Sequence, residues 1–133
     1  MSDLTTSPIL RRALLLDAVA TGATALLLVL GAGLLADLLG LPSALMRVAG
    51  LILVPFVGLV AWTASQARPP AGAVWTIILG NAAWVAASLV LLVSGWVAPT
   101  ALGYAFVIAQ ALAVGIFAEL QVMGLRRAKV AVA

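Results

Sequence analysis

The chain has 133 residues, of which 65% are hydrophobic and only 8% are charged. A soluble domain averages about 45–50% apolar and about 25% charged residues, because its whole surface must interact with water. This composition excludes an ordinary soluble domain and indicates one domain, residues 1–133, that is surrounded by a lipid bilayer.

The residue types that are missing narrow the possible chemistry. The sequence contains no Cys and no His, so it has no thiolate nucleophile and lacks the commonest general base and metal ligand. It also has no nucleotide-binding glycine loop and no nucleophile–base motif. We therefore expect no enzymatic activity, no metal site and no cofactor. The net charge of +3 lies mainly at the ends of the apolar segments, which is typical of membrane topology and not of nucleic-acid binding.

Four apolar segments follow one another, each long enough to cross a hydrocarbon core of about 30 Å as a helix. The predicted spans are residues 13–36, 44–64, 74–97 and 101–124. Gly40 and Pro42 separate the first two spans, Pro69 and Pro70 the next two, and Pro99 the last two. Connections this short make consecutive helices antiparallel neighbours. The predicted fold class is therefore an all-α integral membrane protein, an antiparallel four-transmembrane-helix bundle.

The orientation of the bundle follows from its basic residues. Six of the seven lie on one side of the predicted membrane, namely Arg11, Arg12, Arg68, Arg126, Arg127 and Lys129. Only Arg47 lies on the other side, so the positive-inside rule places both termini in the cytoplasm. Trp62 and Trp75 would mark the cytoplasmic interface, and Trp96 and Tyr104 the opposite one. We expect a multi-pass protein of a bacterial-type inner (plasma) membrane.

The two halves of the chain show a faint internal similarity. An offset of 64 residues aligns Asp17 with Asn81 and Thr24 with Ser88. Two tandem two-helix repeats, related by an axis along the membrane normal, would explain this alignment. The alternative is chance similarity between helices that are all rich in Ala, Leu and Val.

Several polar residues lie inside the predicted spans, where each needs a physical reason to be present. They form a candidate polar seam consisting of Asp17, Thr21, Thr24, Asn81, Trp84 and Ser88. Helical spacing places Asp17, Thr21 and Thr24 on one face of the first span, and a facing stripe on the third span would contain Asn81 and Ser88. The seam is either a protonatable site for a coupling ion or cationic ligand, or a set of interhelical hydrogen bonds that fixes helix packing.

Trp84 lies near the bilayer centre, away from both interfaces, so its indole N–H needs an acceptor there. Asp17, Thr21 or a backbone carbonyl could serve as that acceptor. A packed core tryptophan and the wall of a ligand cavity are the two interpretations of this residue.

Glu119 is the second acid inside a predicted span. Helical angles of about 180–200° separate it from Gln110 and Gln121 on the same span, so one groove cannot contain all three. Either Glu119 or the glutamines would face a second surface, such as a contact in a homo-oligomer, or Glu119 would reach the headgroups or pair with Arg126.

Pro55 predicts a kink in the second span, because proline removes one backbone donor.

These features favour a small membrane protein with an accessory or structural role, which binds itself or another membrane protein through helix faces. The alternative is an oligomeric transporter or channel for ions or small molecules, with Asp17 or Glu119 as its protonatable coupling group. A phage-type holin is a third hypothesis, based only on chain size and the basic tail.

Overall fold

A computed structural model describes residues 8–132 of the chain, and side chains as far as residue 128, so the side chain of Lys129 lies outside the described part. Every regular element in this part is a helix. The helices are α1 (Pro8–Leu30), α2 (Ala32–Leu39), α3 (Ser43–Ser65), α4 (Ala71–Val93) and α5 (Ala101–Val132).

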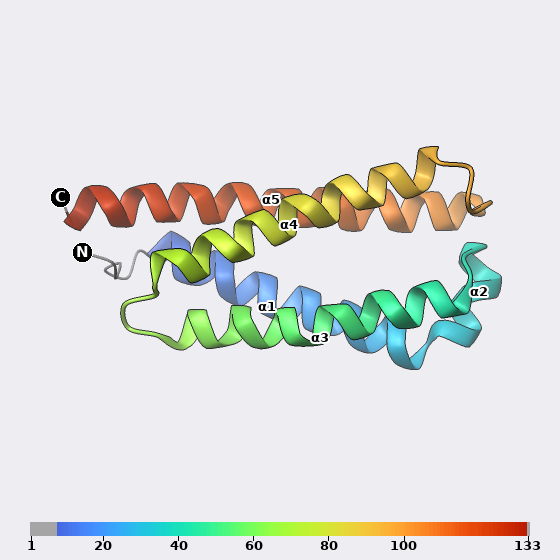
Figure 1. The fold of residues 1–133 in the computed structure, drawn as a ribbon, viewed down its shortest axis with the longest axis horizontal. Coiled ribbons are helices and arrows are strands. Elements are labelled where there is room, and N and C mark those ends of the chain that lie inside the picture. The colour runs from blue at the N-terminus through green and yellow to red at the C-terminus, as the bar shows by residue number, and fades with distance from the viewer. Residues whose placement is uncertain (1–7, 133) are drawn as a thin grey trace.

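Four of these helices, α1, α3, α4 and α5, are long and apolar enough to cross a membrane. The expectation of an all-α chain with four such helices is confirmed. The chain reverses direction between successive long helices (Figure 1). Large hydrophobic side chains cover their outer surface: Leu30 and Val93, for example, are 80% and 84% exposed. Such an exterior suits contact with lipid and suggests a multi-pass membrane protein.

The first apolar segment contains a bend that its hydropathy does not reveal. Span 13–36 was expected to be continuous, whereas α1 ends at Leu30 and α2 begins at Ala32. Gly31 lies between them and its N–H donates to the Leu27 carbonyl at 2.8 Å. A Cβ at Gly31 would lie 2.7 Å from that same oxygen, so only glycine permits this geometry.

The third apolar segment also ends earlier than the predicted boundary at residue 97. Helix α4 ends at Val93, where the Ser94 hydroxyl donates to the Leu91 carbonyl at 3.0 Å and Gly95 has φ +79°. At the start of α5, the Thr100 hydroxyl accepts the Gly103 N–H at 3.1 Å and donates to the Leu38 carbonyl at 2.7 Å. These bonds tie this loop to the end of α2.

The long helices form two pairs, α1 with α3 and α4 with α5, and α1 also packs against α5. Helices α3 and α4 contact each other only sparsely, although a short loop connects them. In Figure 1 they diverge from this loop toward the end that contains α2. One side of the molecule is therefore less tightly packed than the other.

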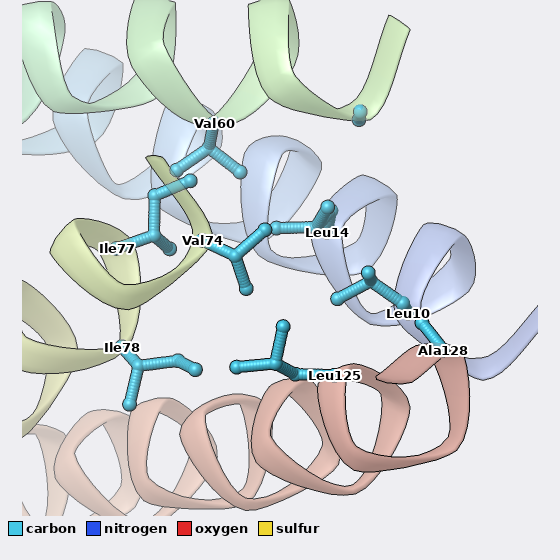
Figure 2. Packing of buried hydrophobic residues seen from close by; sticks show 9 residues of the cluster. Leu10, Leu14, Val60, Val74, Ile77, Ile78, Leu125 and Ala128 are labelled. Atoms are coloured by element: carbon cyan, nitrogen blue, oxygen red, sulfur yellow. The ribbon is translucent and has the colours of Figure 1, made fainter. Parts of the chain in front are cut away.

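Two clusters of buried hydrophobic residues lie toward opposite ends of the molecule. The first joins α1, α3, α4 and α5 near the chain termini and is shown in Figure 2; its labelled residues are Leu10, Leu14, Val60, Val74, Ile77, Ile78, Leu125 and Ala128. The second joins α1, α2, α3 and α5 at the other end and includes Ala25, Leu28, Leu39, Met46 and Val107. The buried polar residues of α1 and α4 lie between these clusters along the helices.

Candidate functional site

Asp17 is the centre of a buried hydrogen-bonded network. Its side chain is fully buried, with 0% of its surface exposed. Oδ1 accepts the Thr21 hydroxyl at 2.7 Å, and Oδ2 accepts the amide nitrogens of Asn81 and Gln121, both at 2.7 Å. The carboxylate thereby connects α1, α4 and α5. We refer to Asp17, Thr21, Asn81 and Gln121 as the Asp17 network.

The two amides of the network also bind each other. Nδ2 of Asn81 donates a second hydrogen bond, at 3.1 Å, to Oε1 of Gln121. A carboxylate oxygen needs donors, and this requirement turns both amide nitrogens toward Asp17. Within the described residues, no fully buried side-chain nitrogen or oxygen lacks a partner. The Asp17 network therefore joins three helices through hydrogen bonds that satisfy its buried polar groups.

Gln121 is the member of this network that the sequence analysis did not place in the seam. It is fully buried, with 0% of its surface exposed. Gln110 and Gln121 are eleven residues apart, which corresponds to about 20° around a helix, so both point to one face of α5. That shared face is the signal that could have included Gln121 with Asp17 and Asn81.

A second polar cluster lies on α4 and α5 and contains Trp84, Ser88 and Gln110. The Trp84 indole N–H donates to Oε1 of Gln110 at 2.6 Å. Nε2 of Gln110 donates to the Ser88 hydroxyl at 3.0 Å and to the Val107 carbonyl at 2.9 Å. Gln110 is thus the acceptor of Trp84, instead of the Asp17, Thr21 or backbone carbonyl that had been considered.

The candidate polar seam is therefore divided. Thr21 and Asn81 join Asp17, whereas Trp84 and Ser88 join Gln110. The Thr24 hydroxyl donates at 2.8 Å to the Ala20 carbonyl of its own helix. This hydrogen bond within α1 does not connect the two clusters.

Two cavities lie next to these polar clusters. The larger, cavity A, has a volume of about 450 Å³ and is lined by all four long helices, with Thr21, Thr24, Phe56, Asn81 and Phe117 among its residues. Cavity B, of about 340 Å³, lies toward α2 and includes Met46 and Trp96. Thr24, Trp84, Ala87 and Gln110 line both. The Trp84–Gln110 pair thus belongs to a wall that the two cavities share.

Glu119 lies on the opposite face of α5 from these glutamines. Its side chain is exposed, and it has no hydrogen bond or ion pair with the described part of the chain, including Arg126. Of the two surfaces considered from the sequence, the glutamines face the interior and Glu119 faces outward.

Pro55 is also exposed, and α3 continues through it as a single helix. It does not line cavity A or cavity B.

Arg11 has a structural role that its position in the sequence did not reveal. Its guanidinium donates to the Ala64 carbonyl at 3.1 Å and to the Gln66 carbonyl at 3.0 Å. Both carbonyls belong to the end of α3, where helical carbonyls lack partners within the helix. Arg11 therefore joins the start of α1 to the end of α3.

Comparisons with protein-family models, with curated proteins and with solved structures found no match to this chain.

Proposed function

We propose that this chain is an accessory protein of a bacterial-type inner membrane, which catalyses no reaction and associates with a membrane partner through α5. In the proposed orientation, both termini and the α3–α4 loop are cytoplasmic. The Arg residues at that end support this orientation. The exposed Trp62, Trp75, Trp96 and Tyr104 near the helix ends support the placement of the helices across the membrane.

The orientation predicts how fused reporters behave. A reporter that is active only in the cytoplasm is expected to be active at either terminus and inactive when inserted at residues 94–100. A reporter that requires the periplasm is expected to show the reverse pattern. Periplasmic activity at either terminus would contradict the proposed topology.

The exposed position of Glu119 is the observation that carries the proposed association. On α5 it lies in a stripe with Leu112, Ile116 and Met123, which are 64%, 55% and 44% exposed. An acid that faces hydrocarbon costs about 2.5–3.5 kcal/mol on insertion scales. A neighbouring helix that donates hydrogen bonds to Glu119 would remove much of this cost. The partner is a second copy of this chain or another membrane protein with a donor at that depth.

The replacement Glu119→Leu tests this association. Wild-type protein extracted in native lipid nanodiscs is expected to be an oligomer or to carry a stoichiometric partner, whereas Glu119→Leu protein is expected to be a lone monomer. Glu119→Gln is expected to retain part of the association, because its amide still hydrogen-bonds. Mass photometry of the nanodiscs and analysis of co-purified protein provide the measurement.

The matched control for Glu119→Leu is Asp37→Leu, which removes another exposed acid, at the end of α2 and outside the Glu119 stripe. Asp37→Leu is expected to leave the association unchanged. A wild-type protein that is monomeric and free of partners would contradict the proposal. Equal loss of association in both variants would also contradict it.

Transport is the second candidate function, and the specific observation in its favour is cavity A beside the Asp17 network. Asp17 or Glu119 would then be the coupling group. Four helices enclose little space for a pathway, so transport would also require an assembly of several copies.

We also propose that the two halves descend from one two-helix unit. Asp17 and Asn81, which the 64-residue offset aligns, bind each other directly, and Thr24 and Ser88 both donate to the carbonyl four residues earlier. The halves differ in packing, since α1 packs against α5 while the corresponding contact of α4 with α3 is sparse. This difference is what leaves room for cavity A.

A further inference from the structure

The polar side chains that line cavity A already donate their hydrogen bonds to other groups of the protein. The hydroxyls of Thr21 and Thr24 donate to Asp17 and to the Ala20 carbonyl. The Asn81 amide donates to Asp17 and Gln121. The Trp84 indole donates to Gln110, and the Gln110 amide donates to Ser88 and to the Val107 carbonyl. The polar capacity that remains at this wall therefore consists of acceptor lone pairs.

Oδ1 of Asn81 is the best defined of these acceptors. Asn81 is only 3% exposed, and its oxygen accepts no hydrogen bond from the described residues. Because no fully buried side-chain nitrogen or oxygen in the described part lacks a partner, this oxygen keeps some surface open. Asn81 lines cavity A, and we infer that this open surface of its oxygen faces the cavity. The Asp17 carboxylate holds the amide in this orientation by binding its nitrogen.

The residues that line cavity A carry no formal charge of either sign. Directly behind the Asn81 amide is the Asp17 carboxylate, which has no ion pair with any described residue. The aromatic rings of Phe56, Trp84 and Phe117 form part of the wall, and such rings attract cations.

We propose that cavity A binds a lipophilic amine in its protonated form. The N–H groups of the amine would donate to Oδ1 of Asn81 and to the Thr24 hydroxyl, and the apolar body would lie among the aromatic and aliphatic residues. The volume of about 450 Å³ lies within the range of about 300–1,000 Å³ that is usual for small-molecule sites. This proposal is independent of the association through α5, because Glu119 does not line the cavity.

The experiment measures binding of matched probes to the full chain by isothermal titration calorimetry. The protein is placed in nanodiscs of phosphatidylcholine, whose headgroup has no N–H donor, and the heat of partitioning into empty nanodiscs is subtracted. The probes are 4-phenylbutylamine, butylbenzene and 4-phenylbutanoate. Saturable binding of the amine, at least about tenfold tighter than of either other probe, is expected. Equal binding of the amine and butylbenzene, or tighter binding of the carboxylate, would overturn the proposal.

Two variants locate the binding site without changing the Asp17 network. Ala83→Leu places a larger side chain in cavity A and is expected to weaken amine binding by about tenfold or more. The matched control is Ala82→Leu at the preceding position of α4, which is exposed and does not line cavity A. Ala82→Leu protein is expected to bind the amine as wild type does. Thr24→Val removes one acceptor and is expected to weaken binding by a few-fold. Unchanged binding in Ala83→Leu protein would also overturn the proposal.

A final arm identifies the source of the amine. Phosphatidylethanolamine carries the same protonated amine on an apolar body, so it is added to the nanodiscs in increasing proportion. Competition with 4-phenylbutylamine would assign the cavity to the lipid headgroup. Binding that is independent of this lipid would assign it to a free lipophilic amine.

Discussion

Replacement of Asp17 by leucine is expected to lower the free energy of unfolding by about 2–4 kcal/mol. The change removes the acceptor of three hydrogen bonds, from Thr21, Asn81 and Gln121, in a fully buried site. The donors then remain buried without this acceptor, and a buried donor that loses its acceptor is costly. The three helices α1, α4 and α5 lose their common polar contact. Steric trapping or unfolding in mixed micelles measures the difference from wild type.

Glu119→Leu is the matched control, because it also removes an acid from inside an apolar helix. Glu119 is exposed and has no hydrogen bond or ion pair with the described residues, so its removal is expected to leave the monomer at least as stable as wild type. The stability of Asp17→Asn protein is expected to fall between those of the two leucine variants. Asparagine keeps the size of the side chain but replaces one acceptor oxygen with an amide donor, which would face other donors. An Asp17→Leu protein as stable as wild type would show that the Asp17 network contributes little to the fold.

The same Asp17→Asn protein separates the two candidate functions. A carboxylate that serves only to join helices leaves the association through α5 intact, so partner binding is expected to persist in folded Asp17→Asn protein. Proton-coupled transport through Asp17 would instead disappear in reconstituted vesicles that contain folded Asp17→Asn protein. Proton-coupled transport that survives both Asp17→Asn and Glu119→Gln would eliminate both acids as the coupling group.

Replacement of Gly124 by alanine is expected to destabilise the protein by about 1–3 kcal/mol through overpacking. A Cβ at this position would lie 2.6 Å from both the backbone nitrogen and the Cα of Leu10. Backbone atoms cannot rotate away, so α1 and α5 would have to move apart next to the hydrophobic cluster of Figure 2. The movement would also strain the bond between Gln121 and Asp17, one turn away on α5.

The control for Gly124→Ala is Gly115→Ala on the same helix, where an added Cβ meets no atom within 4 Å. Alanine is the better helix former by about 1 kcal/mol in water, so Gly115→Ala is expected to be neutral or slightly stabilising. Thermal unfolding in detergent, followed by circular dichroism at one protein concentration, compares the two variants. Similar midpoints for both would contradict the close packing of α1 and α5 at Gly124.

Close packing at small residues was only partly predictable from spacing. Gly50 and Gly58 of α3 belong to one small-residue pattern in the sequence. A Cβ at Gly50 would lie 2.7 Å from Val29 of α1, whereas one at Gly58 would meet no atom within 4 Å. The same spacing thus describes a glycine in a helix contact and a glycine on an open surface. Only the rotation of α3 about its axis distinguishes them.

The sequence alone determined that the chain is helical, that four of its helices could cross a membrane, and that polar residues lie within the first, third and fourth predicted spans. These properties depend on the local order of apolar and polar residues, because the length of an apolar run and the proline and glycine that end it act within one segment. The bend at Gly31 could not be predicted in this way, because the apolar run continues on both sides of it.

The tertiary structure decided how these polar residues combine. Gln121 binds Asp17, Gln110 accepts the hydrogen bond of Trp84, and Glu119 is exposed on the outer surface. The tertiary structure also left α3 and α4 apart, so that a cavity with an acceptor wall lies between the two helix pairs. The physical reason is that helix periodicity fixes which residues share a face, whereas the direction of that face depends on how distant helices pack together.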